Sequence, residues 1–207
     1  MLNEHASSRA RVMTGSALML GLLAFAGAPA EAASTFSFPM VRANGLDAGC
    51  APRAAAYVTI RSLGFAERMT VTVRGLPPGT ALDLFTIQAA DFPFGIGWYV
   101  GDLEVGRDGT VTKSFVGRFN VETFALGAGQ RPVPAPTHAG DARGRNPAFA
   151  PIHTYHLGIW FNSPADAARA GGTCPANVTP FNGEHSAGVQ VLSTRNFVAA
   201  GPLQRVD

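Results

Sequence analysis

Apolar and polar residues alternate along much of the chain with a period of two. In the segment Arg68 to Arg74 (RMTVTVR), a methionine and two valines fall on one face, and arginines and threonines fall on the other. This alternation is typical of a strand with one buried face, because successive side chains point to opposite sides of a sheet. Segments 57–61 and 82–87 show a similar pattern with more apolar character on both faces. We predict strands in all three segments.

Turn signals separate further segments of this kind. Pro78-Gly79 fits the central positions of a type II turn, which predicts a hairpin over residues 68–88. Asp108-Gly109 tolerates positive φ and predicts a second hairpin. The remaining predicted strands, including the two joined by that second turn, are 36–41, 97–105, 110–119, 153–161 and 188–195.

One segment carries the start and stop signals of a helix. Ser163 is a suitable N-cap, Pro164 suits the first helical position, and Gly171-Gly172 ends the segment. We expect a short connecting helix rather than a recognition helix. Seven or eight strands with turns between most of them predict an all-β fold, an antiparallel β-sandwich.

The turn after the strand 68–74 resembles a corner of immunoglobulin-like sandwiches. Leu76, Pro78, Gly79 and Thr80 match the L-x-P-G-T-x-Y pattern of fibronectin type III modules, although Leu82 replaces the tyrosine. The resemblance covers about seven residues and implies an immunoglobulin-like fold, whose members commonly serve adhesion or binding. Cu/Zn superoxide dismutase has a comparable Gly-Leu-Pro-Pro-Gly turn, but no H-x-H pair follows the turn here.

Residues 1–33 have the organisation of a secretory signal peptide. Arg9 and Arg11 form a basic region, residues 17–26 form a short apolar region, and alanines up to Ala33 offer cleavage sites. We therefore expect residues 34–207 to form a single domain that a bacterium secretes, located outside the cell or in the cell-envelope space. No other apolar run approaches the about twenty residues of a membrane helix, so we expect no membrane span in the mature chain.

Charge and cysteine content narrow the classes of partner and environment. The formal net charge is only +2, which argues against a nucleic-acid partner because such partners call for a clustered basic face. Cys50 and Cys174 are the only cysteines, and in an exported chain they predict one disulfide. The close C-x-x-C spacing of a redox or metal pair is absent.

Histidines supply a candidate metal site. His153-Thr-Tyr-His156 resembles an H-x-x-H pair, and His185 could add a third ligand for zinc or copper. Residues three apart in a regular strand point to opposite faces, so both imidazoles reach one ion only across a bulge. We favour the alternative that these histidines make ordinary hydrogen bonds.

Aromatic residues beside glycines supply a candidate ligand platform. Trp98, Tyr99 and Trp160 lie in two such segments, and exported β-proteins often bind sugars or peptides on aromatic rings. The alternative, which we prefer, is that the two tryptophans belong to the core of facing sheets.

The sequence assigns no catalytic residue. It lacks a Gly-x-Ser-x-Gly motif, and its acidic residues are few and scattered. The proline-rich segment of about 120–151 predicts a long irregular loop that is either functional or flexible. We predict a secreted, non-catalytic binding or structural protein without a cofactor, whose partner is an unknown extracellular glycan or protein. The alternatives are an extracellular metal-binding protein that uses the histidines and, third, a secreted hydrolase.

Overall fold

The computed structural model describes residues 34–119, 124–125, 152–181, 185–197 and 200–205. The predicted signal peptide, 1–33, lies outside these residues. Most of the predicted irregular loop, about 120–151, lies outside them as well.

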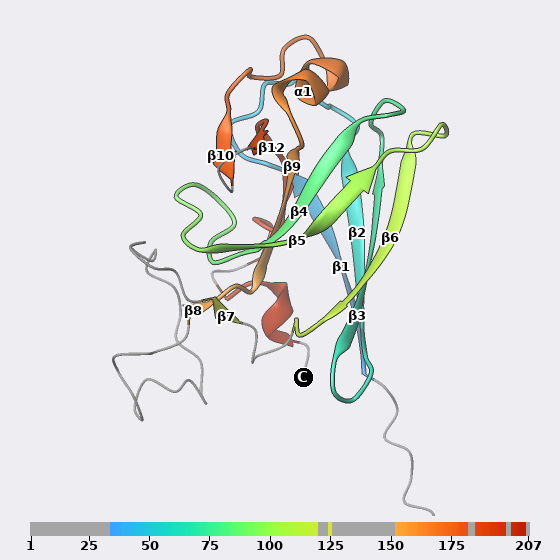
Figure 1. Ribbon diagram of the computed structural model, residues 1–207, viewed down its shortest axis with the longest axis vertical. Coiled ribbons are helices and arrows are strands. Elements are labelled where there is room, and N and C mark those ends of the chain that lie inside the picture. The colour runs from blue at the N-terminus through green and yellow to red at the C-terminus, as the bar shows by residue number, and fades with distance from the viewer. Residues whose placement is uncertain (1–33, 120–123, 126–151, 182–184, 198–199, 206–207) are drawn as a thin grey trace, which may run out of the picture. The chain divides into compact units, whose positions relative to one another are not determined.

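The described chain is mostly antiparallel β-structure with one short α-helix, α1, over Pro164–Ala170 (Figure 1). A short 3-10 helix, η3, spans Pro202–Arg205. The antiparallel strands and the single short α-helix confirm the predicted all-β class with one short connecting helix. The strands are β1 (Thr35–Arg42), β2 (Ala55–Ser62), β3 (Glu67–Arg74), β4 (Ala81–Ile87), β5 (Gly97–Glu104), β6 (Thr110–Gly117), β7 (Phe124–Ala125), β8 (Ile152–His153), β9 (His156–Phe161), β10 (Thr179–Phe181), β11 (His185–Ala187) and β12 (Gln190–Ser193).

Eight of the strands form one antiparallel sheet in the order β5-β4-β9-β12-β1-β2-β3-β6. The edge strands β5 and β6 contact each other, so the sheet is nearly barrel-shaped. Between these two edge strands, Lys113 Nζ of β6 donates a hydrogen bond of 2.8 Å to the main-chain carbonyl of Asp102 in β5. The predicted two-sheet sandwich is not confirmed, because β1 pairs along most of its length with β2 and near its end with β12.

The main core fills the inside of this sheet. In β3, Met69, Val71 and Val73 are fully buried there, which confirms the alternation expected from the sequence. The strands β4 and β9 are buried on both faces. Their outer faces contribute Phe85, Ile87 and Trp160 to a second, smaller core, which also contains Ala187 of β11 and has Phe94 packed against it. The apolar character on both faces of residues 82–87 reflects these two cores.

The first predicted hairpin, over residues 68–88, is wrong, although its turn forms. Thr80 N donates to Pro77 O over 3.3 Å and Gly79 has a φ of +74°, as a type II turn requires. However, β3 pairs with β2 and β6, whereas β4 pairs with β5 and β9. A type II turn does not match the twist of a two-stranded hairpin, so the strands separate. The turn therefore carries the chain from one half of the sheet to the other.

The second predicted hairpin is also wrong, because its two strands do not pair with each other. A turn forms in which Gly109 N donates to Gly106 O over 3.0 Å and Gly109 has a φ of +77°. The strands on its two sides, β5 and β6, are the opposite edges of the sheet and do not pair in register. Instead, β5 forms a hairpin with β4, which the sequence did not predict.

The helix and the disulfide follow the sequence closely. Asp166 N donates to the Ser163 N-cap hydroxyl over 3.2 Å, and Gly171 is the C-cap. Cys50 and Cys174 form a disulfide that links segments 124 residues apart, which confirms the predicted pairing.

The strand predicted over 153–161 is interrupted between β8 and β9. In the described part of the chain, no helix is long and apolar enough to cross a membrane.

Candidate functional site

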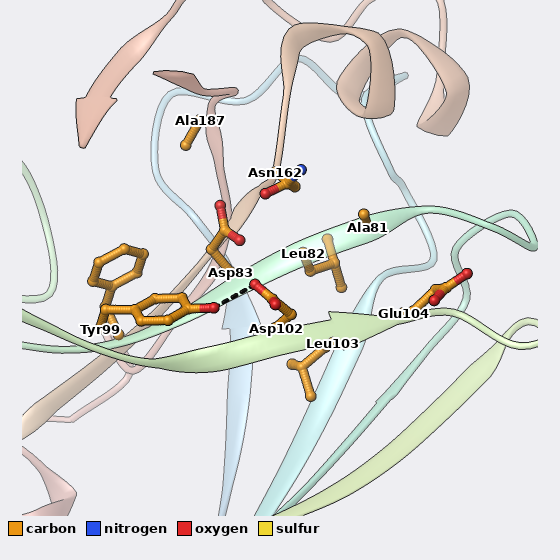
Figure 2. A pocket seen from close by; sticks show the side chains of 10 residues that line it. Ala81, Leu82, Asp83, Tyr99, Asp102, Leu103, Glu104, Asn162 and Ala187 are labelled. Atoms are coloured by element: carbon orange, nitrogen blue, oxygen red, sulfur yellow. Dashed lines mark hydrogen bonds between the residues drawn. The ribbon is translucent and has the colours of Figure 1, made fainter. Parts of the chain in front are cut away.

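A cavity of about 480 Å³ lies on the outer face of β4 and β5 (Figure 2). This volume falls in the range of ligand-binding cavities, which is roughly 300 to 1,000 Å³. The cavity is lined by Ala81, Leu82, Asp83, Phe85, Tyr99, Asp102, Leu103, Glu104, Asn162 and Ala187.

The register of β4 and β5 brings the polar and aromatic side chains together. The leucines of β4 face the core, so the alternate residues Asp83 and Phe85 face outward. Asp83 lies opposite Asp102, and Phe85 lies opposite Tyr99. Two carboxylates and two rings therefore occupy neighbouring positions across a single strand pair.

A β-bulge places Tyr99 and Asp102 on the same face of β5. Residues three apart in a regular strand face opposite sides. The register shifts between Leu84 and Phe85, which leaves Val100 without a direct partner. As a result, the Tyr99 hydroxyl donates a hydrogen bond to the Asp102 carboxylate.

Glycine is required beside this bulge. Gly101 has a φ of +154°, and a Cβ at this position would lie 2.6 Å from the ring of Phe115 on β6. The close approach of the two edge strands and the geometry of the bulge therefore depend on the same residue.

The cavity has an acidic character. Asp83, Asp102 and Glu104 all line it, and no lysine, arginine or histidine is among the described residues that do so. Figure 2 shows the Asp83 carboxylate directed toward Asn162 and Ala187, with Glu104 apart from both aspartates. The Tyr99 ring is 44% exposed, so it forms an open aromatic wall.

Tyr99 remains a hydrogen-bond donor over the whole physiological range of pH. Partial burial, the hydrogen bond to Asp102 and the negative charges of Asp102 and Asp83 raise the pKa of its hydroxyl well above the usual value of 10. Its proton therefore stays between the ring and Asp102.

The N-terminal end of α1 holds the first residues of β4 beside the cavity. Asp166 Oδ1 accepts a hydrogen bond of 3.1 Å from Ala81 N, and Asn162 N donates to Ala81 O over 2.9 Å. Arg169 of the helix also donates to the carbonyl of Gly79, in the turn before β4. The helix thus positions the strand that carries Asp83.

The three predicted platform residues do not share one surface. Trp98 is 66% exposed, but it precedes Tyr99 in β5 and therefore points to the opposite face. Trp160 is 1% exposed and packs edge-on against Phe85, which in turn packs against Tyr99, with ring centroids 5.5 Å apart in each pair. Tyr99 alone of the three presents its ring to the cavity.

Two of the predicted metal ligands, His153 and His156, do not line the cavity. His156 is buried, with Nδ1 3.0 Å from Thr194 Oγ1, and the His153 ring stacks on Tyr155. His185 begins β11, but its side chain lies outside what the structure describes. Within the described residues, no group of three histidine, cysteine or acidic side chains is placed to hold a metal ion. The zinc or copper site stays a prediction.

A second cavity, of about 330 Å³, lies beside the aromatic cluster at Phe94 and Trp160. Its rim includes Phe92, whose ring is 84% exposed, and the amide side chains of Asn44 and Asn177. The two cavities therefore have different polar groups, carboxylates in the first and mainly amides in the second.

Sequence reasoning missed the acidic residues of the larger cavity. Asp83, Asp102 and Glu104 look scattered along the chain, because neighbours across a strand pair are not neighbours in sequence. The available signal was Asp83 itself, an acidic residue within the otherwise apolar strand ALDLFTI. No protein-family model, curated protein or solved structure matches the chain.

Proposed function

We propose that the protein is an exported, non-catalytic binding protein and that the cavity on the outer face of β4 and β5 is its ligand site. The observation that carries this proposal is the lining, which combines three carboxylates with the open ring of Tyr99 and, as far as the structure describes it, includes no basic residue. The disulfide fits an oxidising environment outside the cytoplasm, in agreement with the leader-like N-terminus.

The lining favours a ligand that brings hydrogen-bond donors. Carboxylates accept hydrogen bonds and do not donate them when ionised, and the Tyr99 proton is already donated to Asp102. An aromatic face also attracts cations and packs against apolar ring faces. A sugar that carries amino groups offers hydroxyl donors, positive charge and an apolar ring face together.

A calorimetric titration with a glucosamine tetramer tests this proposal. We expect Tyr99→Ala and Asp102→Asn each to weaken binding by about tenfold, equivalent to about 1.4 kcal/mol. Phe92→Ala removes a more exposed ring at the other cavity and should leave the affinity nearly unchanged. Melting temperatures of the variants control for folding. Equal losses in all three variants, or no binding of the tetramer, would refute the assignment of this cavity.

One observation favours the hydrolase alternative. Asp83 and Asp102 are direct cross-strand neighbours, and glycoside hydrolysis uses a pair of carboxylates that flank the scissile bond. Incubation of the same tetramer followed by product analysis separates the two functions. Cleavage that disappears in Asp83→Asn would replace the binding proposal by a hydrolytic one.

The metal-binding alternative is tested by metal analysis of protein secreted from its native host. Stoichiometric zinc or copper that is lost when His153, His156 and His185 are replaced together would favour it. Metal that persists in the replaced protein would locate its ligands elsewhere in the chain.

A further inference from the structure

A surface of different character covers the outer face of β1, β2, β3 and β6. The strand β3 presents Arg68, Thr70, Thr72 and Arg74 on this side, because its alternate residues face the core. These outward residues come from the RMTVTVR segment, and none of them lines the cavity on the outer face of β4 and β5.

Strand register aligns these side chains with hydroxyl groups on the neighbouring strands. Three pairs of hydroxyls are hydrogen-bonded across strands over 2.8 to 2.9 Å. The pairs are Ser37–Thr59, Thr70–Ser114 and Thr72–Thr112. They form short rows that run across the sheet, with Tyr57 of β2 exposed beside them.

Two arginines lie directly opposite each other at one end of these rows. Arg61 of β2 is the register partner of Arg68 of β3, and both are exposed. Like charges directly opposite each other destabilise a strand pair. Neither side chain forms an ion pair or a hydrogen bond with another described residue.

Acidic groups do not compensate these arginines on the same face. The outward positions of β1, β2, β3 and β6 contain no aspartate or glutamate. Glu67 of β3 faces inward, is 2% exposed and accepts a hydrogen bond of 2.5 Å from Phe119 N. The small net charge of the whole chain therefore conceals a locally basic surface.

We infer that this arginine–hydroxyl face, defined by Arg61, Arg68, Arg74 and the six paired hydroxyls, binds an acidic polysaccharide. A guanidinium group pairs with carboxylate or sulfate oxygens through two parallel hydrogen bonds. The hydroxyl groups in these rows suit hydrogen bonds with the alcohol groups of a sugar chain. Arg68 and Arg74 are six residues apart on one strand, roughly 20 Å, so an extended chain meets both ends of the face.

The observations favour a polysaccharide over a nucleic acid. The face has three arginines, whereas nucleic-acid surfaces carry denser basic stripes. Single-stranded nucleic acids also need aromatic rings on which successive bases stack. Tyr57 is the exposed ring among the outward residues of these four strands.

Binding of dextran sulfate to the full secreted chain tests the inference, with neutral dextran as the matched ligand without charge. We expect the double replacement Arg61→Gln and Arg68→Gln to weaken binding to dextran sulfate by about tenfold or more. The control Arg107→Gln removes an exposed arginine in the turn after β5 and should weaken it by about twofold or less. Added salt should weaken binding by the wild-type protein, because the contact is exposed.

Folding does not confound this test. Replacement of both arginines of this like-charged pair relieves their repulsion, so the double variant should melt at or above the wild-type temperature. Equal weakening by Arg107→Gln would show that binding depends on net charge alone, and this would overturn the inference. Equal binding of neutral dextran, or no binding of either polymer, would also overturn it. Tighter binding of a DNA duplex with the same dependence on Arg61 and Arg68 would replace the polysaccharide by a nucleic acid.

Discussion

At the scale of single residues, Tyr99 shows how one side chain joins the fold to the candidate site. Its ring packs against Phe85 of the small outer core, and its hydroxyl donates to Asp102 in the cavity. The bulge at Val100 makes this contact between residues three apart. The same side chain therefore supplies the apolar wall and fixes the orientation of one carboxylate.

Tyr99 should ionise at higher pH than an ordinary tyrosine. The pH dependence of phenolate absorbance, taken as the difference between the wild type and Tyr99→Phe, isolates this residue among the three tyrosines. We expect the difference curve to rise well above pH 10, because burial and the nearby aspartates raise the pKa of Tyr99. A curve centred near 10 would contradict the hydrogen bond to Asp102.

The same shift determines a pH dependence of stability. The folded protein holds the Tyr99 proton at pH values where the unfolded chain has lost it, so this contribution is complete below about pH 10 and falls as pH rises further. The Tyr99→Phe variant should lack this part of the alkaline decline in the free energy of unfolding.

At the scale of elements, the GLPPGT segment carries the chain between the two halves of the sheet. Gly75 and Gly79 both have positive φ, +80° and +74°, but their surroundings differ. A Cβ at Gly75 would lie 2.0 Å from the carbonyl oxygen of Arg53, whereas a Cβ at Gly79 would only touch the flexible side chain of Arg169. Alanine at Gly79 would therefore cause backbone strain alone, whereas alanine at Gly75 would cause both backbone strain and a steric clash.

We predict unequal effects of alanine at these two glycines. Gly79→Ala should lower the free energy of unfolding by about 1 to 2 kcal/mol, the cost of a left-handed conformation for a residue with a Cβ. Gly75→Ala should cost more, because the main chain at Arg53 must also move. Urea denaturation of both variants measures the difference. Equal losses would show that the contact with Arg53 is not tight.

At the scale of the whole molecule, the disulfide connects parts of the fold that strand pairing does not join directly. Cys50 lies in the segment after β1 and is fully buried, whereas Cys174 follows α1. Gly171, the helix C-cap, also lies against the main chain of this segment. The cross-link therefore fixes the helix end to the β1–β2 connection.

Replacement of both cysteines by serine should lower the free energy of unfolding by about 4 to 5 kcal/mol, since the bond closes a very long loop in the unfolded chain. Denaturant titrations of the wild type and the double variant measure this loss. Intact-mass analysis of the secreted wild type should show both thiols oxidised within one chain. A double variant as stable as the wild type would show that the unfolded chain gains little freedom when the bond is absent.

The local features of this protein could be predicted from its sequence alone. Alternating residues such as those of RMTVTVR specify a strand and its buried face, because the side-chain period of a strand is built into its backbone. Ser163, Pro164 and Gly171 specify the helix through groups within a few residues of each other. The disulfide followed because the chain has only two cysteines. The type II turn at Pro78-Gly79 was also local.

The pairing of the strands, in contrast, depends on the whole fold, and this pairing creates the candidate sites. Both predicted hairpins were wrong because a turn fixes local direction, whereas burial of two faces on β4 and β9 selects their partners. Asp83 meets Asp102, and Arg61 meets Arg68, only through strand register. The sequence contains each of these residues but not their proximity, because contacts across a sheet depend on how the whole chain closes around its core.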